Sequence, residues 1–124
     1  MAETQKKILV AEDERPIARA LELKLTAAGY SVTVVFNGED AVSELSKNDF
    51  DLLLLDLIMP KVDGFGVLES MRVKKITVPV IVLSNLSQEE DLKRAKELGV
   101  ADYFVKSDNP ISEIVDHVRK ALIV

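Results

Sequence analysis

The sequence contains no cysteine, and this absence excludes disulfide bonds, cysteine-based zinc sites and thiol catalysis. No apolar run approaches the roughly 20 residues that a membrane-spanning helix requires, and the first residues lack the apolar segment of a signal peptide. Linkers, internal repeats and low-complexity segments are also missing. We therefore expect a single cytoplasmic domain over residues 1–124, without membrane association.

Basic residues are in the minority, since 16 Lys and Arg stand against 21 Asp and Glu for a formal net charge of −5. Surfaces that bind nucleic acids or anionic membranes depend on an excess of positive charge, so neither kind of binding is expected. Hydrophobic residues make up 48% of the 124 residues and charged residues 30%. This balance is typical of a globular domain that can bury a sizeable core.

Apolar segments alternate with amphipathic segments along the whole chain. Strands are predicted over residues 8–11, 31–36, 52–55, 78–83 and 101–105. Helical patterns begin near Pro16, Asn37, Phe65, Ser87 and Pro110. Several strand segments have no polar alternation, which is typical of strands buried on both faces. The alternation predicts an α/β fold, a parallel sheet with helices on both faces and right-handed crossovers.

Reactive side chains follow four of the five predicted strands. They are Glu12 and Asp13 after the first strand, Asp56 after the third, Ser84 after the fourth and Lys106 after the fifth. In a doubly wound sheet of order 2-1-3-4-5, the second strand is the outer edge and the other four are neighbours. Ligands of such sheets bind beyond the carboxyl ends of the strands, so these side chains should converge in one crevice.

These residue types suit phosphoryl chemistry beside a hard cation. Three carboxylates in one crevice repel each other, so at least one pKa should rise unless a cation joins them. Oxygen ligands of this kind favour Mg²⁺ (or Mn²⁺). The Lys106 ammonium and the Ser84 hydroxyl suit phosphoryl oxygens. Asp56 lies centrally and is the natural nucleophile for an aspartyl phosphate.

Each of these residues also has an ordinary structural explanation. The acidic run 12–14 fits a solvated helix start, where the helix dipole favours carboxylates. Asp56 and Ser84 could be turn residues, and Lys106 a surface charge. Only the convergence of all of them at one sheet edge favours a site. His117, the single histidine, is predicted to be a surface residue and not a phosphodonor.

In the order and spacing of these residues, the chain resembles the receiver domain of two-component response regulators. The matching features are the Glu12-Asp13 pair, the apolar run into Asp56, Met59-Pro60 with Asp63-Gly64, Ser84, and Gly99-Val100-Ala101-Asp102-Tyr103-Phe104-Val105-Lys106. The resemblance covers nearly the whole chain. It implies a flavodoxin-like three-layer sandwich with a five-stranded parallel sheet of order 2-1-3-4-5.

The resemblance also implies transfer of a phosphoryl group from a histidine kinase, or from a phosphotransfer protein, to Asp56. Asp13, Asp56 and the backbone carbonyl of Ile58 would ligate Mg²⁺, and Glu12 would act through water. Such a domain is not a conventional enzyme, because it catalyses only its own aspartyl phosphorylation and dephosphorylation.

Within the resemblance, three side chains would respond to the phosphoryl group. Lys106 would pair with it, Ser84 would move to hydrogen-bond it, and Tyr103, otherwise an amphipathic residue at a sheet margin, would turn inward as an aromatic switch. The output would then be a change of the surface formed by the fourth helix, the fifth strand and the fifth helix. A downstream protein or a second copy of the chain would bind there.

Ser107 departs from the family pattern, because many relatives carry proline directly after the lysine, joined by a cis peptide bond. A cis bond before a residue other than proline costs ~3 kcal/mol. Either the site holds a cis Lys106–Ser107 bond against that cost, or the loop takes another path. We predict the cis bond.

Three further positions should set the rates at which Asp56 is phosphorylated and dephosphorylated. Asn85 stands where relatives usually carry Ala or Gly, so it would narrow access to Asp56. Ile58 and Leu86 are apolar where some relatives use polar side chains to orient the hydrolytic water. These two residues predict a comparatively long-lived phosphorylated state.

Two other functions compete with a phosphorylatable switch. A receiver-like interaction module with a vestigial site is disfavoured by the intact set of acids, serine and lysine. A small phosphotransferase or phosphatase is disfavoured because no second acid follows shortly after Asp56 and no substrate cap is present. The chain is either a complete single-domain regulator or a part of a larger protein.

Overall fold

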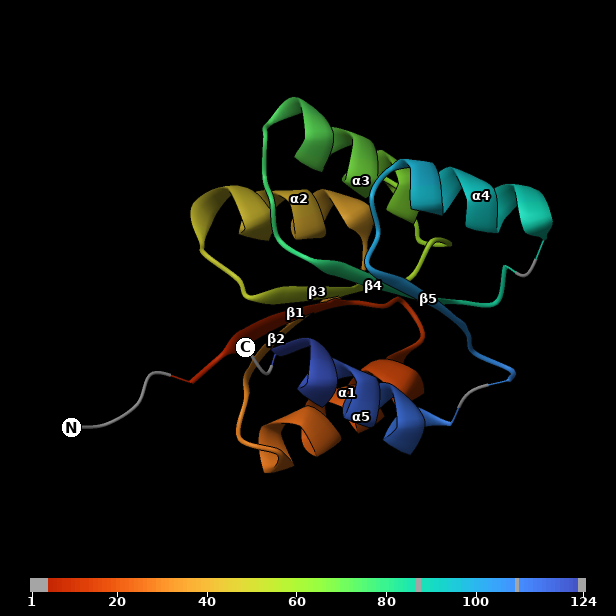
Figure 1. The fold of residues 1–124 in the computed structure, drawn as a ribbon. Coiled ribbons are helices and arrows are strands. Elements are labelled where there is room, and N and C mark those ends of the chain that lie inside the picture. The colour runs from red at the N-terminus through yellow and green to blue at the C-terminus, as the bar shows by residue number, and fades with distance from the viewer. Residues whose placement is uncertain (1–4, 87, 109, 123–124) are drawn as a thin grey trace.

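Five parallel strands form one sheet in the computed structural model, which describes residues 5–86, 88–108 and 110–122. The strands are β1 (Lys7–Ala11), β2 (Ser31–Val35), β3 (Leu52–Leu55), β4 (Val80–Ser84) and β5 (Asp102–Val105). The helices are α1 (Arg15–Ala27), α2 (Gly38–Lys47), α3 (Gly64–Val73), α4 (Glu89–Glu97) and α5 (Ile111–Leu122). The strand order is β2-β1-β3-β4-β5, which confirms the predicted topology (Figure 1).

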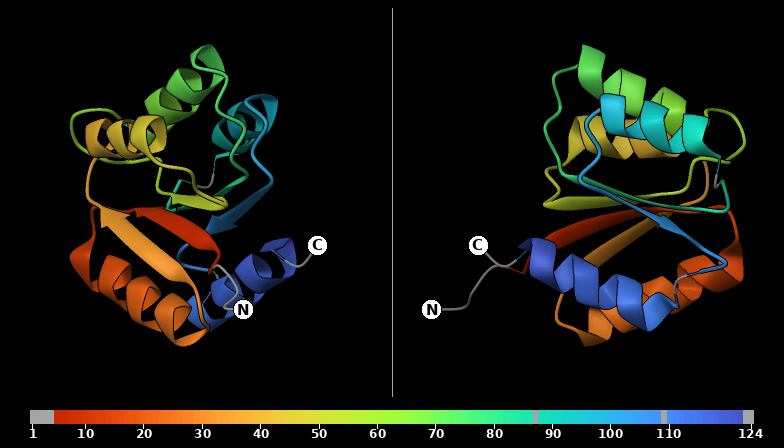
Figure 2. Two further views of the ribbon diagram at one scale, coloured as in Figure 1. Left: turned by 90° about the vertical axis from the view of Figure 1, so that its left-hand side faces the viewer. Right: turned by 45° about the vertical axis from the view of Figure 1, so that its right-hand side comes forward.

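The sheet lies between two layers of helices. Helices α2, α3 and α4 cover one face, and α1 and α5 cover the other (Figures 1 and 2). Successive side chains of a strand point to opposite faces, so Leu53 and Leu55 join the core beneath α2, α3 and α4, while Leu52 and Leu54 join the core against α1 and α5. All four leucines are buried, which explains why β3 has no polar alternation.

Local signals mark the start of α2 and the ends of α1 and α4 where the sequence predicts them. The Asn37 side chain accepts a hydrogen bond from the Asp40 N–H at 2.8 Å and so caps α2. Gly29 and Gly99 follow α1 and α4 with φ angles of 100° and 87°, a left-handed conformation that glycine adopts without a steric penalty. The predicted helix start at Ser87 lies outside the described residues.

Strand β4 begins later than predicted. Pro79 has no N–H to donate to a ladder, although its carbonyl accepts a hydrogen bond from the Leu53 N–H at 2.9 Å. Regular pairing therefore starts at Val80 and continues to Ser84. Ser84, predicted to follow the strand, is its last residue.

The prediction of a cis Lys106–Ser107 bond is wrong. The described residues contain no cis peptide bond. The chain turns through residues 106–108, and the Asp108 N–H donates to the Val105 carbonyl at 3.0 Å. Without proline the trans form is favoured by ~3 kcal/mol, and a loop that takes another path avoids this cost.

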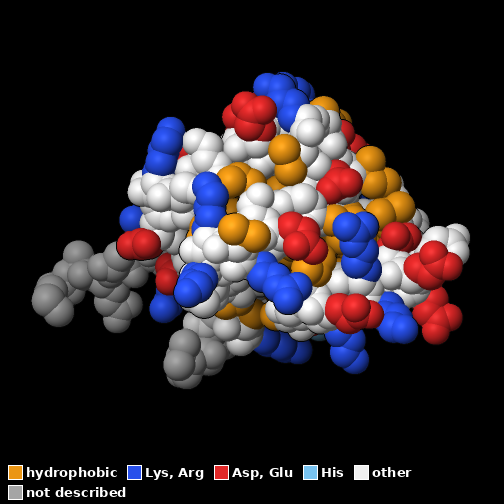
Figure 3. Space-filling model, turned by 90° about the horizontal axis from the view of Figure 1, so that it is seen from above, with side chains coloured by type: hydrophobic (Ala, Val, Ile, Leu, Met, Phe, Trp, Pro, Cys, Tyr) orange, Lys and Arg blue, Asp and Glu red, His pale blue; other side chains and the backbone are white. Residues whose placement is uncertain are grey.

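The surface over α2, α3 and α4 carries acidic and basic side chains side by side, with small apolar areas between them (Figure 3). This face therefore shows no extended basic patch. Within the described part of the chain, no helix has the length and apolar character needed to cross a membrane.

Candidate functional site

The site lies where β1, β3, β4 and β5 end, and backbone hydrogen bonds continue the sheet into it. The Asp56 N–H donates to the Ala11 carbonyl at 2.9 Å, and the Lys106 N–H donates to the Ser84 carbonyl at 2.9 Å. The Glu12 N–H donates to the carbonyl of Val35, the last residue of the edge strand β2, at 3.0 Å. Glu12, Asp56 and Lys106 are thus fixed by the same ladder that pairs the strands.

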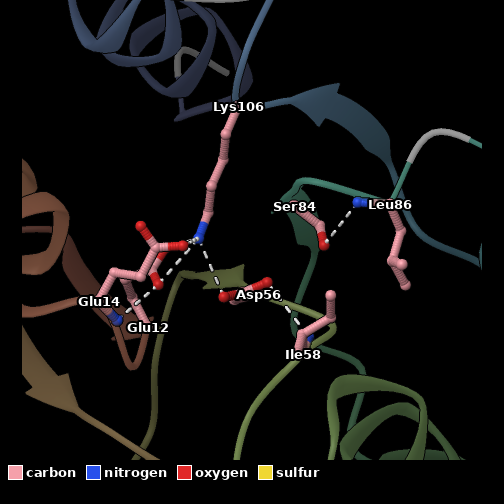
Figure 4. Close-up of polar contacts among 7 residues, drawn as sticks. All are labelled: Glu12, Glu14, Asp56, Ile58, Ser84, Leu86 and Lys106. Atoms are coloured by element: carbon pink, nitrogen blue, oxygen red, sulfur yellow. Dashed lines mark hydrogen bonds and ion pairs between the residues drawn. The ribbon is translucent and has the colours of Figure 1, made fainter.

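The Lys106 ammonium is the centre of the charged part of the site (Figure 4). Its Nζ lies 2.7 Å from Glu12 Oε1, 3.0 Å from Asp56 Oδ2 and 3.1 Å from Glu14 Oε1. The Lys106, Glu12 and Asp56 side chains are only 7%, 2% and 3% exposed. Lys106 thus lies beside Asp56, where its predicted pairing with a phosphoryl group stays a prediction. The ion pairs with Glu12 and Glu14 were not predicted, and the only signal for them is the acidic run after β1.

Three carboxylates form a cluster beside this lysine. Glu12, Asp13 and Asp56 each present an oxygen, and these oxygens lie within 4.8 Å of one another. This spacing and donor set fit a hard divalent cation. The Ile58 N–H donates to Asp56 Oδ1 at 3.2 Å, so the backbone of Ile58 lies next to the cluster. The roles of individual ligands remain predictions.

Burial and mutual repulsion raise the pKa values of two carboxyl groups. Burial raises the pKa of Glu12 to about 7, and Asp56 adds to the rise while the hydrogen bond from Lys106 opposes it. Burial and Asp56 also raise the pKa of Asp13. Burial by itself would lower the pKa of Lys106, but hydrogen bonds to Glu12 and Asp56 outweigh it and raise that pKa. The lysine stays charged, and the site holds an excess of acid.

The loop between β3 and α3 is shaped by a close backbone approach. The Gly64 N–H donates to the Leu57 carbonyl at 2.9 Å. A Cβ at Gly64 would lie 2.5 Å from the Asp56 carbonyl oxygen, so only glycine fits there. The loop leaves the Ile58 side chain 53% exposed. An apolar side chain therefore stands in solvent next to Asp56, as the hypothesis of slow hydrolysis requires.

Ser84 and Tyr103 both bind the backbone of Leu86. The buried Ser84 Oγ accepts a hydrogen bond from the Leu86 N–H at 3.3 Å (Figure 4). The Tyr103 hydroxyl donates to the Leu86 carbonyl at 2.7 Å. Burial raises the pKa of Tyr103 to about 12, and Asp91 and Asp56 add to the rise. Tyr103 also packs against the core beneath α2, α3 and α4, so its ring already lies inward. No local pattern in the sequence indicated that Leu86 would be the shared partner.

Two other predicted positions lie at the margin or outside this site. Asn85 is exposed to solvent, and its predicted effect on access to Asp56 stays a prediction. His117 lies on α5, and its ring packs against that of Phe104 on β5, with ring centroids 4.5 Å apart. It is not a member of the acidic cluster.

The sequence pattern of the response regulator receiver domain family matches residues 8–119. The chain therefore belongs to the response regulator receiver domain family, as the resemblance indicated. The described fold, five parallel strands ordered 2-1-3-4-5 with five helices, is that of this flavodoxin-like family.

Individual relatives agree with this membership. A probable transcriptional regulator, ycf27 of Porphyridium aerugineum, is 42% identical over 118 residues, covering 95% of this chain and 48% of the relative. The chain spans about half the length of the curated relatives it matches. The receiver domain of the Francisella response regulator 1452 superposes with a TM-score of 0.88 at 32% identity, covering 94% of this chain and 96% of that one. The phosphorylated cyanobacterial phytochrome response regulator RcpA superposes with a TM-score of 0.81 at 30% identity, covering 94% of this chain and 91% of that one.

Proposed function

We propose that this chain is a phospho-accepting switch whose acceptor is Asp56. The observation that carries the proposal is the buried Asp56 carboxylate, 3.0 Å from the Lys106 ammonium and within the acidic cluster at the strand ends. Phosphoryl transfer needs mainly positioning and neutralisation of charge, and this arrangement supplies both. A phosphorylated response regulator among the similar structures supports the same reading.

The donor is a histidine kinase, or a phosphotransfer protein, that presents a phosphohistidine. An Asp56 oxygen attacks the phosphorus, and the new O–P bond forms as the P–N bond breaks. The electron pair of the broken bond stays on the imidazole nitrogen, which takes up a proton. The Lys106 ammonium then neutralises charge on the transferred oxygens. The Ser84 hydroxyl leaves the Leu86 N–H and donates to the phosphoryl group.

Mg²⁺ (or Mn²⁺) is the cofactor that the acidic cluster fits. Asp13, Asp56 and the Ile58 carbonyl would hold it directly, and Glu12 through water. When bound, the cation supplies positive charge for the phosphoryl oxygens, which the single ammonium of Lys106 does not balance alone.

The output face is α4, β5 and α5, where a downstream protein or a second copy of the chain binds. Tyr103 on β5 is hydrogen-bonded to the loop that leads into α4. Ser84 is hydrogen-bonded to the Leu86 N–H in the same loop, so a movement of Ser84 also disturbs the Leu86 carbonyl that Tyr103 binds. Since relatives are transcriptional regulators, the downstream effect is on transcription, without nucleic-acid contact by this domain itself.

The test is incubation with Mg²⁺ and phosphoramidate, compared with Asp56→Asn. We expect one stable phosphoryl group on the wild-type protein and none on the variant, measured by intact mass. No incorporation by the wild type would favour an interaction module. Rapid release of phosphate with continued turnover would favour a phosphatase.

The lifetime of the phosphorylated state is set by Ile58 and Leu86. Neither side chain can orient a water for attack on the phosphoaspartate. Replacing them together, Ile58→Asn with Leu86→Glu, is expected to speed dephosphorylation by about tenfold, because a positioned polar group lowers the barrier to that attack. An unchanged dephosphorylation rate would contradict this idea.

A further inference from the structure

Lys106 has more carboxylate partners than the proposed chemistry requires. A lysine ammonium has three donors, and three carboxylates, those of Glu12, Asp56 and Glu14, lie within 3.1 Å of Nζ. Two of these acids belong to the proposed acceptor and metal-holding set. Glu14 does not, so its contact with Lys106 needs another explanation.

The Glu14 side chain has no structural task at the helix start. Glu14 is the N-cap residue of α1, but its side chain makes no capping hydrogen bond. Its backbone N–H donates to Glu12 Oε2 at 2.9 Å, and this contact does not depend on the side chain. The carboxylate is 48% exposed. The ion pair with Lys106 is therefore the interaction that a substitution of this side chain would remove.

Resting on the proposed function, we propose that Glu14 is a positioning residue that holds the Lys106 ammonium on the α1 side of the site and slows phosphoryl acceptance. As the O–P bond to Asp56 forms and the donor's P–N bond breaks, a doubly charged group arrives beside Lys106. The Glu14 carboxylate competes with that group for one ammonium donor. Of the three acids around the lysine, it is the solvent-exposed one and the one whose contact is most easily lost.

The competition predicts a modest gain of rate when the carboxylate is removed. Exposed ion pairs contribute little, and their loss corresponds to a change of about two- to fivefold. Glu14→Gln should therefore accept phosphate from phosphoramidate about two- to fivefold faster than the wild type at saturating Mg²⁺. Saturating metal removes any contribution from a changed affinity for the cation.

Two further variants separate the ion pair from other effects. Glu22→Gln removes the same charge from the same helix at a residue whose partner is Arg19, 3.4 Å away, and should match the wild type. Glu14→Asp keeps the charge but shortens the side chain by one methylene, so it should weaken the contact with Lys106 and also be faster. Raising the ionic strength should bring the wild-type rate toward that of Glu14→Gln, because salt screens exposed pairs.

The outcomes are distinct. Rates of Glu14→Gln that equal those of Glu22→Gln, or fall below the wild type, overturn the proposal. A fast Glu14→Gln with an unchanged Glu14→Asp also overturns it, since only the general negative field would then matter. If the glutamine variant folds poorly, the salt dependence of the wild type alone decides. A wild type that takes no phosphate at Asp56 overturns the proposed function instead.

Discussion

The two halves of the site are held together by different forces. The charged half (Glu12, Glu14, Asp56 and Lys106) consists of ion pairs from the Lys106 ammonium to the buried Glu12 and Asp56 carboxylates and to the exposed Glu14 carboxylate. The switch half (Ser84, Leu86 and Tyr103) consists of two neutral hydrogen bonds to the backbone N–H and carbonyl of Leu86, at 3.3 and 2.7 Å. Both halves lie at the same sheet edge, but they respond to different changes.

The contrast indicates which half rearranges. Removing one partner of a buried ion pair costs about 3–5 kcal/mol, whereas a neutral hydrogen bond contributes about 1 kcal/mol. When Asp56 is phosphorylated, the buried ion pairs of the charged half should therefore keep their geometry. The hydrogen bonds of the switch half should be the ones that change partners. The Ser84 hydroxyl can exchange the Leu86 N–H for a phosphoryl oxygen at small cost. The β4–α4 loop, to which Tyr103 is hydrogen-bonded, is then free to move.

The largest effect on the free energy of unfolding is expected from removing the Lys106 ammonium. Lys106→Met leaves Glu12 and Asp56 buried without compensation, so the free energy of unfolding should fall by about 3 kcal/mol in Mg²⁺-free buffer. Urea unfolding measures this change. Lys96→Met, at an exposed position of α4, is the control and should change stability by less than about 0.5 kcal/mol. Equal effects of the two variants would mean that the charged half is not rigid.

A smaller effect is expected from pH. The raised pKa of Glu12, about 7, means that the folded protein binds a proton there more tightly than the unfolded chain does. This contribution to stability is present at low pH and is lost as the pH rises through about 7. The difference in unfolding free energy between the wild type and Glu12→Gln should shift by about 2 kcal/mol from pH 5 to pH 7 without metal. A pH-independent difference would contradict the assignment.

The smallest effect is expected in the switch half. Tyr103→Phe removes the hydrogen bond to the Leu86 carbonyl and should lower the free energy of unfolding by about 1 kcal/mol. Amide shifts in ¹H–¹⁵N spectra should be confined to the β4–α4 loop and β5, and the phosphorylation rate should stay within about twofold because the charged half is untouched. Tyr30→Phe changes the only other tyrosine and serves as the control. A phosphorylation rate that falls by more than about twofold would show that the halves are not separable.

Much of the fold could be predicted, because its signals are local. The apolar run at residues 52–55, the cap at Asn37 and the glycines after α1 and α4 each act over a few residues. The start of β4 was misplaced because Pro79 takes part in the sheet only through its carbonyl. The bond after Lys106 was predicted wrongly, since residue 107 is serine and the trans form is favoured there by ~3 kcal/mol.

The sequence by itself determined which chemical groups stand at the strand ends. Parallel strands of known order must bring Glu12, Asp56, Ser84 and Lys106 to one edge. Only the tertiary structure decided which of these groups touch. Glu14 meets Lys106 across 92 positions of sequence, and Leu86 meets Tyr103 across 17. Such contacts depend on loop paths and side-chain directions that are fixed when helices pack on the sheet, and no local pattern records them.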